Sequence, residues 1–459
     1  MPDNESEIAD ILAALFQSSN REGIEYCVLR DYEGLPKTYR SDVDFLVNPA
    51  DRLRFQDIIL NVAADRGWVL AKHVRKFSMW QYFFYPAKSD DAAGRFILQL
   101  DLFYNISWKG IALFSSQEIL QWRTKYHEIF VPNANHEATI LLLKDLLSQG
   151  RVFPKYRVRV PMLIEQDPDG FRACGQPIVG QQVAKFLLQR ATLARWDEIE
   201  AGRNVIRLNV VWRAFTQAPM AQMIKTWRWA WGHLRQPISY PAGSFIVVLG
   251  SDGCGKTTVI YELMPLLEKL FTRSRRLAFN FNTVPHILGD LRNWIRRRRR
   301  RDHVSPNERV REGPRLTPFP TFRALAHLAY HTVGFLLGYP LLFVTRRRGE
   351  LIIVERYFYD YFVQPSYARI PRWLLKAVLR LLPKPDAVIY LHGDAQLIHD
   401  RKPELPVNEI ERQEAICRSL LLQAPNGHMI DVSASVSATA RQIAHVVCQV
   451  IEGKQGQRP

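Results

Sequence analysis

The sequence predicts an α/β protein of several domains: a doubly wound parallel sheet in the C-terminal domain, an α+β N-terminal domain, and a helical connector. Three observations predict this fold class. The chain has 459 residues, more than one ordinary core holds. A glycine-rich turn joins a buried strand to a helix at residues 244–270, and strands and helices alternate from there onward. Residues 135–235 instead carry apolar residues at helical spacing.

The composition is that of a globular, intracellular protein. Hydrophobic residues make up 47% and aromatic residues 11% of the chain, which excludes a disordered one. The five cysteines are scattered without paired spacing, which favours a reducing compartment over a disulfide framework or zinc site. The first residues, "MPDNESEIADILAALF", are acidic and lack the basic flank of a secretory signal, so we expect a cytoplasmic protein.

The N-terminal domain, residues 1–134, is expected to mix strands with helices. The segments "EYCVLR", "DVDFLV" and "RFILQLDLF" read as strands, and "PADRLRFQDIILNVAADRG" reads as a helix. Asp42 and Asp44 are two residues apart on a strand, so both carboxylates point to one face and can share a divalent metal ion. Asp101, on a later strand, is a third candidate ligand.

A helical connector is expected over residues 135–240. Its helices include "HEATILLLKDLLSQG", which ends in glycine, and "VVWRAFTQAPMAQMIKTWRWAWGHLR". The stretch "RQPISYPAGS", with two prolines and a glycine, is typical of a linker. The C-terminal domain therefore spans residues 241–459.

The strongest motif of the chain opens the C-terminal domain. Gly250, Gly255, Lys256 and Thr257 match G-x-x-x-x-G-K-[ST] between a strand and a helix. Glycines let backbone amides turn onto phosphate oxygens, the lysine reaches the β- and γ-phosphates, and the threonine hydroxyl binds Mg²⁺. The sequence thus predicts an ATP and Mg²⁺ site whose loop comprises Gly250, Ser251, Asp252, Gly253, Cys254, Gly255, Lys256, Thr257 and Thr258.

Two later segments place charged residues where ligands bind in such folds. Glu355 and Arg356 end the strand of "ELIIVERYFYD", at the carboxyl edge of the sheet. Arg401 and Lys402 open the polar segment "DRKPELP" after the strand "PDAVIYLHGD" and a helix. Phosphoryl transfer needs cations beyond the γ-phosphate and exclusion of water, so we interpret this segment as a closing lid.

A basic and apolar insertion is expected over residues 285–348. The formal net charge of the chain is +17, and residues 291–323 hold eleven arginines against three acids, including the run Arg296–Arg301. Such a run is either a solvated segment or a patch for an anionic membrane surface, an anionic glycan or nucleic acid. Nucleic acid ranks lowest because aromatic residues are not interleaved with the arginines. Residues 324–344 carry no formal charge; a buried or partner-facing helix is preferred over peripheral membrane contact or a membrane span.

Together, residues 250–258, "VERYFYD" and "DRKPELP" resemble the thymidylate kinase-like P-loop kinases. The resemblance is closer to two-domain bacterial proteins of that superfamily associated with surface-polysaccharide synthesis. It implies that Arg356 contacts the phosphoryl acceptor, that Glu355 assists Mg²⁺ or the attacking oxygen, and that Arg401 and Lys402 act on the transferring phosphate. It also implies a homodimer. The thymidine-binding signature is replaced by "YFYDYFVQP", so the acceptor stays open.

The motif "YRSDVDFLV" with Asp101 resembles the nucleotidyltransferase fold, which implies two Mg²⁺ ions held by Asp42, Asp44 and Asp101. The Gly-Ser turn of that family is replaced by "VLRDYEGLP", with Arg30 and Asp31. Either Arg30 substitutes as a cation, or the domain binds without catalysis. The leading hypothesis is an ATP-dependent kinase acting on a nucleotide, sugar or glycan-type acceptor. The alternative is an ATP-binding regulatory or scaffold protein in surface-polysaccharide synthesis with a degenerate nucleotidyltransferase domain.

Overall fold

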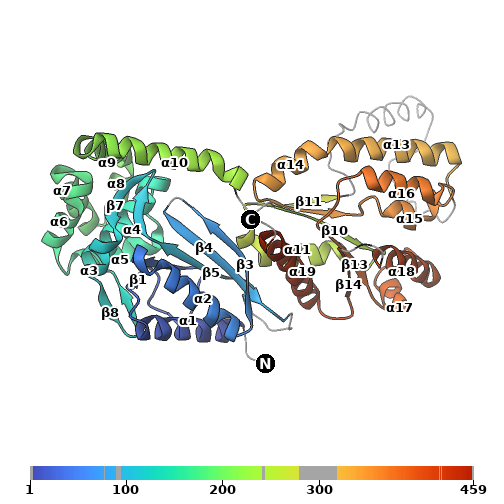
Figure 1. Ribbon diagram of the computed structural model, residues 1–459, viewed down its shortest axis with the longest axis horizontal. Coiled ribbons are helices and arrows are strands. Elements are labelled where there is room, and N and C mark those ends of the chain that lie inside the picture. Colours follow the sequence, from blue (N-terminus) through green and yellow to red (C-terminus); the bar gives the residue numbers. More distant parts are fainter. Residues whose placement is uncertain are drawn as a thin grey trace, which may run out of the picture. The chain divides into compact units, whose positions relative to one another are not determined.

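The computed structural model describes residues 4–456 apart from 77, 89–94, 240–242, 279–317, 423 and 425 (Figure 1). The chain divides into two compact units. The N-terminal unit comprises residues 1–87 and 92–239, and the C-terminal unit comprises residues 240–459 with 88–91. The run Arg296–Arg301 and the predicted insertion up to residue 317 lie outside the described residues.

The N-terminal unit is built on a five-stranded sheet of order β1-β2-β5-β4-β3. Strands β2 and β5 pair in parallel, and the other neighbours pair antiparallel. Helices α1 and α2 bury an aromatic cluster against it, in which Phe45 lies 5.2 Å from Phe55 between ring centroids. The elements are α1 (Asn4–Arg21), β1 (Tyr26–Val28), β2 (Val43–Val47), α2 (Arg52–Asp65), β3 (Trp68–Arg75), β4 (Met79–Pro86) and β5 (Leu98–Phe103).

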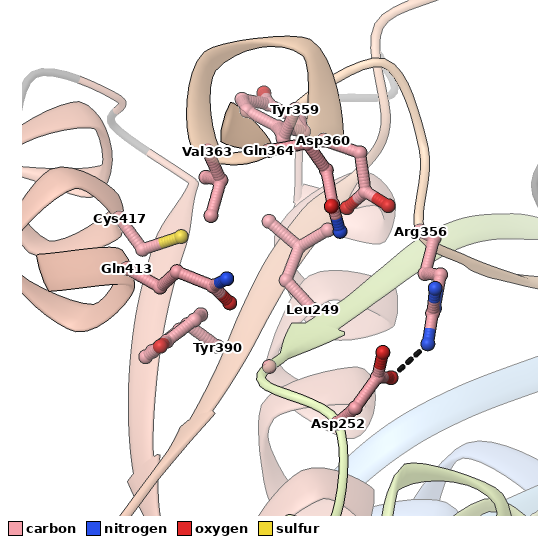
Figure 2. Close-up of a pocket in the computed structure, with 11 residues that line it drawn as sticks. Leu249, Asp252, Arg356, Tyr359, Asp360, Val363, Gln364, Tyr390, Gln413 and Cys417 are labelled. Atoms are coloured by element: carbon pink, nitrogen blue, oxygen red, sulfur yellow. Dashed lines mark hydrogen bonds and ion pairs between the residues drawn. The ribbon is translucent and has the colours of Figure 1, made fainter. Parts of the chain in front are cut away.

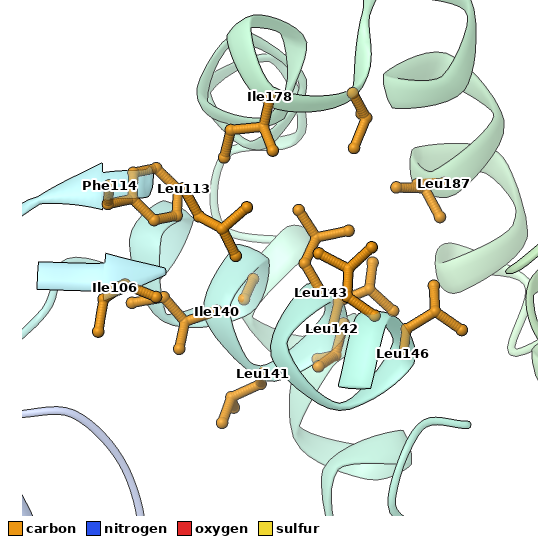
Figure 3. Packing of buried hydrophobic residues seen from close by; sticks show 14 of the residues in the cluster. Ile106, Leu113, Phe114, Ile140, Leu141, Leu142, Leu143, Leu146, Ile178 and Leu187 are labelled. Carbon is orange, nitrogen blue, oxygen red and sulfur yellow. The ribbon is translucent and has the colours of Figure 1, made fainter. Parts of the chain in front are cut away.

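Two hairpins and eight helices complete the described part of this unit. The expected connector helices pack with the N-terminal sheet in one unit, around a second core that includes Leu113, Leu142 and Leu187 (Figure 3). The elements are β6 (Asn105–Trp108), β7 (Ile111–Ser115), α3 (Ser116–Gln121), β8 (Thr124–Tyr126), β9 (Ile129–Val131), α4 (Ala134–Gln149), α5 (Pro154–Ile164), α6 (Pro168–Val179), α7 (Gln181–Thr192), α8 (Trp196–Ala201), α9 (Arg203–Gln217) and α10 (Pro219–Ser239).

The C-terminal unit has the predicted parallel sheet, with strand order β11-β12-β10-β13-β14. Its three inner strands, β12, β10 and β13, are rich in Val, Ile and Leu and almost wholly buried, as expected of a sheet covered on both faces. The elements are β10 (Ser244–Gly250), α11 (Lys256–Leu267), β11 (Ser274–Ala278), α13 (Thr321–Leu337), α14 (Tyr339–Arg347), β12 (Leu351–Glu355), α15 (Asp360–Val363), α16 (Arg372–Leu381), β13 (Ala387–His392), α17 (Ala395–Arg401), α18 (Val407–Leu421), β14 (Gly427–Asp431) and α19 (Val436–Gly456).

The apolar stretch at residues 324–344 forms most of α13 and α14. By length and composition Thr321–Arg347 could cross a membrane, but the sheet argues against it. β10 precedes this stretch and β12 follows it, yet the two strands pair in parallel from Ser244 to Val248. A spanning helix would separate these paired strands. One side of α13 instead packs into the core through Ala324, Leu328 and Phe335, and its other side is exposed.

Candidate functional site

The loop after β10 has the geometry of an anion site. β10 ends at Gly250, and α11 begins at Lys256. Gly253 and Gly255 have φ angles of 98° and 87°, a region that residues with a side chain rarely adopt. The loop therefore turns at these glycines and leads directly into the N-terminus of a helix, whose free amides and dipole favour negative charge.

Lys256 supplies a cation inside this loop. The residue is 6% exposed. Its Nζ donates hydrogen bonds of 2.8 Å to the carbonyl oxygens of both Gly250 and Ser251, and lies 3.7 Å from Oδ1 of Asp252. An almost buried ammonium group beside a helix N-terminus is a strong site for a phosphate. Cys254 is buried below it, with Sγ 3.9 Å from the ammonium nitrogen.

Oxygen ligands for a divalent cation lie next to the loop. The parallel pairing of β10 with β12 places Val248 opposite Glu355, so the carboxylate comes to the start of α11. The hydroxyl of Thr257 donates to Oε2 of Glu355 at 3.3 Å. A hydroxyl beside a carboxylate is a donor set that Mg²⁺ accepts, and these two residues fit that ion. Thr258, the next residue, is exposed.

Arg276 on β11 is a site residue that the sequence analysis missed. Its guanidinium forms an ion pair with Glu355 and donates to the hydroxyl of Thr257 at 3.1 Å. The parallel pairing of β11 with β12 creates this contact. Ala278 lies opposite Glu355, and Arg276, two residues earlier on the same strand, points to the same face of the sheet. Only an alternating pattern in "RSRRLAFN" could have suggested that one of its arginines faces the loop.

Arg356 reaches back to the loop from the neighbouring strand. It directly follows β12 and has a φ angle of 54°, in the left-handed region that an arginine adopts only at a cost. Its guanidinium forms an ion pair with Asp252 (Figure 2). The structure thereby brings Lys256, Arg356 and Asp252 together at the carboxyl end of the sheet.

A pocket opens beside this cluster (Figure 2). Its lining is polar and aromatic as well as aliphatic, and consists of Leu249, Gly250, Asp252, Arg356, Tyr359, Asp360, Val363, Gln364, Tyr390, Gln413 and Cys417. Burial raises the pKa of Asp360 to about 6, although Arg356 and Lys256 act to lower it. No local signal in "YFYD" identifies Asp360 as a site residue, since the pocket exists only once α15 and α18 pack together.

The two predicted lid cations lie at the end of α17. Arg401 is its last residue and Lys402 follows. A Cβ atom placed on Gly253 would lie 3.0 Å from Cβ of Lys402, so the backbone of the predicted lid abuts the loop. The two side chains are exposed, and Nζ of Lys402 lies 3.0 Å from Glu404. The structure therefore brings the base of this segment to the loop, with the Lys402 ammonium paired to Glu404.

The three aspartates of the N-terminal unit also converge. Asp44 and Asp101 are register partners on β2 and β5, and with Asp42 they offer carboxylate oxygens within 4.8 Å of one another. Burial, together with the nearby Asp44 carboxylate, raises the pKa of Asp101 to about 6. The amides of Gln81 and Gln99 hydrogen-bond to the Asp101 carboxylate.

Asp44 already has cationic neighbours. Arg30 forms an ion pair with it, and Nζ of Lys144 lies 3.7 Å from Oδ2. Burial opposes ionisation, but Lys144 and Arg30 hold the pKa of Asp44 below its ordinary value. Its other oxygen, Oδ1, is buried and has no hydrogen-bond partner among the described residues. This unsatisfied oxygen, with two further carboxylates, fits a divalent cation.

The strand order of the C-terminal sheet, with a phosphate loop after its central strand, defines a P-loop NTPase fold. In sequence part of the chain is similar to the thymidylate kinases of Xanthomonas campestris pv. campestris strains B100 and 8004. Each is 28% identical over 220 residues, covering 45% of this chain and 83% of the relative. This homology supports a kinase, a phosphotransferase, in part of the chain.

The chain was also compared with solved structures and with protein-family models. A crystal structure of thymidylate kinase from Ehrlichia chaffeensis aligns with a TM-score of 0.30 and 14% identity, over 45% of this chain and 98% of that one. No protein-family model matches the sequence.

Proposed function

We propose that the C-terminal unit transfers the terminal phosphoryl group of ATP to an acceptor bound in the pocket beside Arg356. The observation that carries this proposal is the convergence of Lys256, the loop glycines and Arg356 at the carboxyl end of the sheet. Two cations that converge on one small region suit phosphoryl transfer, because the negative charge on the moving group must be stabilised.

The loop from Gly250 to Thr258 would hold the triphosphate. Lys256 would exchange its two carbonyl contacts for phosphate oxygens, which are stronger acceptors because they are charged. Thr257 and Glu355 would hold Mg²⁺, which when bound supplies neutralising charge at the phosphates. Arg356 would leave Asp252 and position the acceptor, and Arg401 and Lys402 would close over the transferring group.

The pocket favours an acceptor of nucleotide type. The side chains of Asp360, Gln364 and Gln413 offer hydrogen bonds, Tyr359 and Tyr390 offer aromatic surface, and Arg356 offers a cation. A base, a sugar and a phosphate need these three kinds of contact. The similarity to thymidylate kinases supports the same class, and a sugar or glycan intermediate of surface-polysaccharide synthesis is the other acceptor we propose to test.

The test is phosphoryl transfer by the purified full chain. Labelled ATP would be incubated with nucleoside monophosphates, sugar phosphates and fractionated lysate, with and without membranes. Arg356→Ala should lower kcat/KM for the acceptor about a hundredfold or more while ATP still binds. Arg372→Ala, an exposed arginine outside the pocket, is the control and should have no effect. Binding of ATP without label transfer to any acceptor would refute the kinase and favour a nucleotide-gated scaffold.

A second candidate function, nucleotidyl transfer, belongs to the N-terminal unit. It is favoured by the convergence of Asp42, Asp44 and Asp101. Binding of a divalent cation would have to loosen the contacts of Asp44 with Arg30 and Lys144. Titration of Mn²⁺ in the absence of nucleotide, followed by electron paramagnetic resonance, should show a site that Asp44→Asn removes and Glu355→Gln leaves intact. Equal Mn²⁺ binding by wild type and Asp44→Asn would contradict it.

A further inference from the structure

Helix α10 carries a row of large apolar side chains that face away from the rest of the N-terminal unit. Gln222 is buried and donates to the carbonyl oxygen of Gly110 at 3.3 Å, which fixes one side of the helix to the β6–β7 hairpin. The exposed row recurs at intervals of three and four residues, so it forms one stripe along the helix. Its members, with exposed fractions from 45% to 71%, are Met220, Met223, Ile224, Trp227, Trp231 and Leu234.

Two tryptophans of the stripe stack on each other, and the preceding helix carries a similar exposed row. The rings of Trp227 and Trp231 are stacked with centroids 6.1 Å apart. On α9, Val205, Leu208 and Trp212 are likewise exposed and spaced by three and four residues. Figure 1 shows α9 and α10 running along the outside of the N-terminal unit. Exposed apolar side chains that recur along two successive helices, with three tryptophans among them, mark a docking surface.

The charges around the stripe identify its partner. Residues 201–251 contain six arginines and lysines and no acidic residue. Two of these bases, Arg228 and Arg235, are exposed on α10, and the Arg235 guanidinium lies 4.7 Å from the Trp231 ring. Tryptophan and leucine on one side of a helix with arginine and lysine beside them is the pattern of a helix lying in a bilayer interface, where the aromatic rings enter the headgroup region and the bases meet anionic lipids.

An independent feature of the C-terminal unit agrees with this partner. Helices α13 and α14 expose Phe322, Val333, Leu337 and Phe343 on the side away from the core. Residues 318–349 also contain no acidic residue, and Arg346–Arg348 end the segment. Each of the two segments combines exposed apolar side chains with bases and contains no acidic residue, which suits an anionic surface.

We propose that this chain binds the surface of anionic membranes through the exposed stripe of α10. The binding is peripheral: the stripe enters the interface while Gln222 keeps the other side of the helix on its own unit. The proposal goes beyond the kinase function and does not depend on it.

The experiment is flotation of the full chain with two kinds of vesicle. One contains phosphatidylcholine alone, and in the other about 30% of the lipid is the anionic phosphatidylglycerol. The wild type should float with the anionic vesicles and much less with the neutral ones, and 0.5 M salt should weaken the binding. Trp227→Glu with Trp231→Glu should reduce binding at least tenfold. Trp122→Glu, which changes a tryptophan that is 61% exposed elsewhere on the same unit, should leave it unchanged.

A second variant guards against misfolding. Arg228→Glu with Arg235→Glu changes only exposed charges, and should lose binding to anionic vesicles with an unchanged circular dichroism spectrum. Failure of the wild type to float with anionic vesicles would overturn the proposal. So would binding that both double variants retain. A stripe-dependent dimer in place of vesicle binding would assign the surface to a second copy of the chain.

Discussion

At the scale of single residues, we expect Arg276 to set how readily the proposed Mg²⁺ site at Thr257 and Glu355 fills. Its guanidinium pairs with Glu355 and contacts the Thr257 hydroxyl, so it would compete with Mg²⁺ for both. A partly exposed ion pair contributes about 0.5–1 kcal/mol. Arg276→Gln should therefore lower the Mg²⁺ concentration needed for half-maximal ATP binding about two- to fivefold, measured by titration at fixed ATP.

The neighbouring arginine provides the control for this prediction. Arg275 lies on the same strand but pairs with Glu350, 2.6 Å away and remote from the loop. Arg275→Gln should leave the Mg²⁺ requirement unchanged. An increased requirement in Arg276→Gln would mean that this arginine orients Glu355 for the metal and does not compete with it.

Asp101 links the stability of the N-terminal unit to pH. Its pKa is raised to about 6 in the folded chain from an ordinary 3.8, so between these values the folded state binds the additional proton. The contribution to stability is thus present at pH 4 and is lost as the pH rises through 6. The free energy of unfolding of wild type, relative to Asp101→Asn, should fall by about 2 kcal/mol from pH 4 to pH 7.

Urea unfolding of the full chain at several pH values measures this difference. Asp57→Asn, on the exposed side of α2, is the control and should show no comparable trend. A difference that grows with pH would contradict the assignment, because it would mean that Asp101 is stabilised as the carboxylate.

At the scale of elements, two features fix the conformation of the loop from Gly250 to Thr258. They are the positive φ angles of its glycines and the packing of α17 against Gly253. A methyl group on Gly253 would lie 3.1 Å from the carbonyl oxygen of Ile398 and 3.0 Å from Cβ of Lys402, whereas one on Gly255 would meet nothing within 4 Å. Both glycines have positive φ. Gly255→Ala should cost about 1 kcal/mol from strain alone, and Gly253→Ala about 2 kcal/mol or more.

Thermal unfolding of the two variants would check this order. Gly453→Ala is a suitable control, because that glycine lies within α19 with open space around it and alanine is the better helix former. It should stabilise the unit slightly. If Gly255→Ala were the more damaging of the two loop variants, the packing of α17 against the loop would be wrong.

The elements that the sequence predicted best were those marked by a short local motif. The strand before the glycine-rich turn and the helix after it are β10 and α11, and the predicted parallel sheet is confirmed. The motif predicts these two elements without any other information, because its glycines and its lysine stand at a fixed spacing between a strand and a helix. The nucleotidyltransferase-like character of the N-terminal domain stays a prediction, as do the roles assigned to individual site residues.

Contacts between distant segments could not be predicted in the same way. The pairing of Arg276 with Glu355 depends on the register of β11 against β12, and that of Arg30 with Asp44 depends on where the chain leaves β1. The sequence also identified a helix around residue 227 without indicating that its apolar row would stay exposed. Periodicity gives the apolar side of a helix, but only packing decides what covers it.

At the scale of the whole molecule, the two compact units should respond separately to ligand. Each has its own core, so calorimetry of the full chain should resolve two unfolding transitions. ATP with Mg²⁺ at about a hundred times its Kd should stabilise the C-terminal transition by about 2.7 kcal/mol and leave the other in place. A shift of both transitions would show that the units are coupled.

The central claim is that the loop from Gly250 to Thr258 binds the triphosphate of ATP, with Lys256 as its cation. Isothermal titration of ATP with Mg²⁺ into the full chain tests it most directly. The wild type should bind one ATP per chain, Lys256→Ala should lose that binding, and Lys376→Ala, which changes an exposed lysine on α16, should retain it. Equal ATP binding by wild type and Lys256→Ala, or none by the wild type, would contradict it.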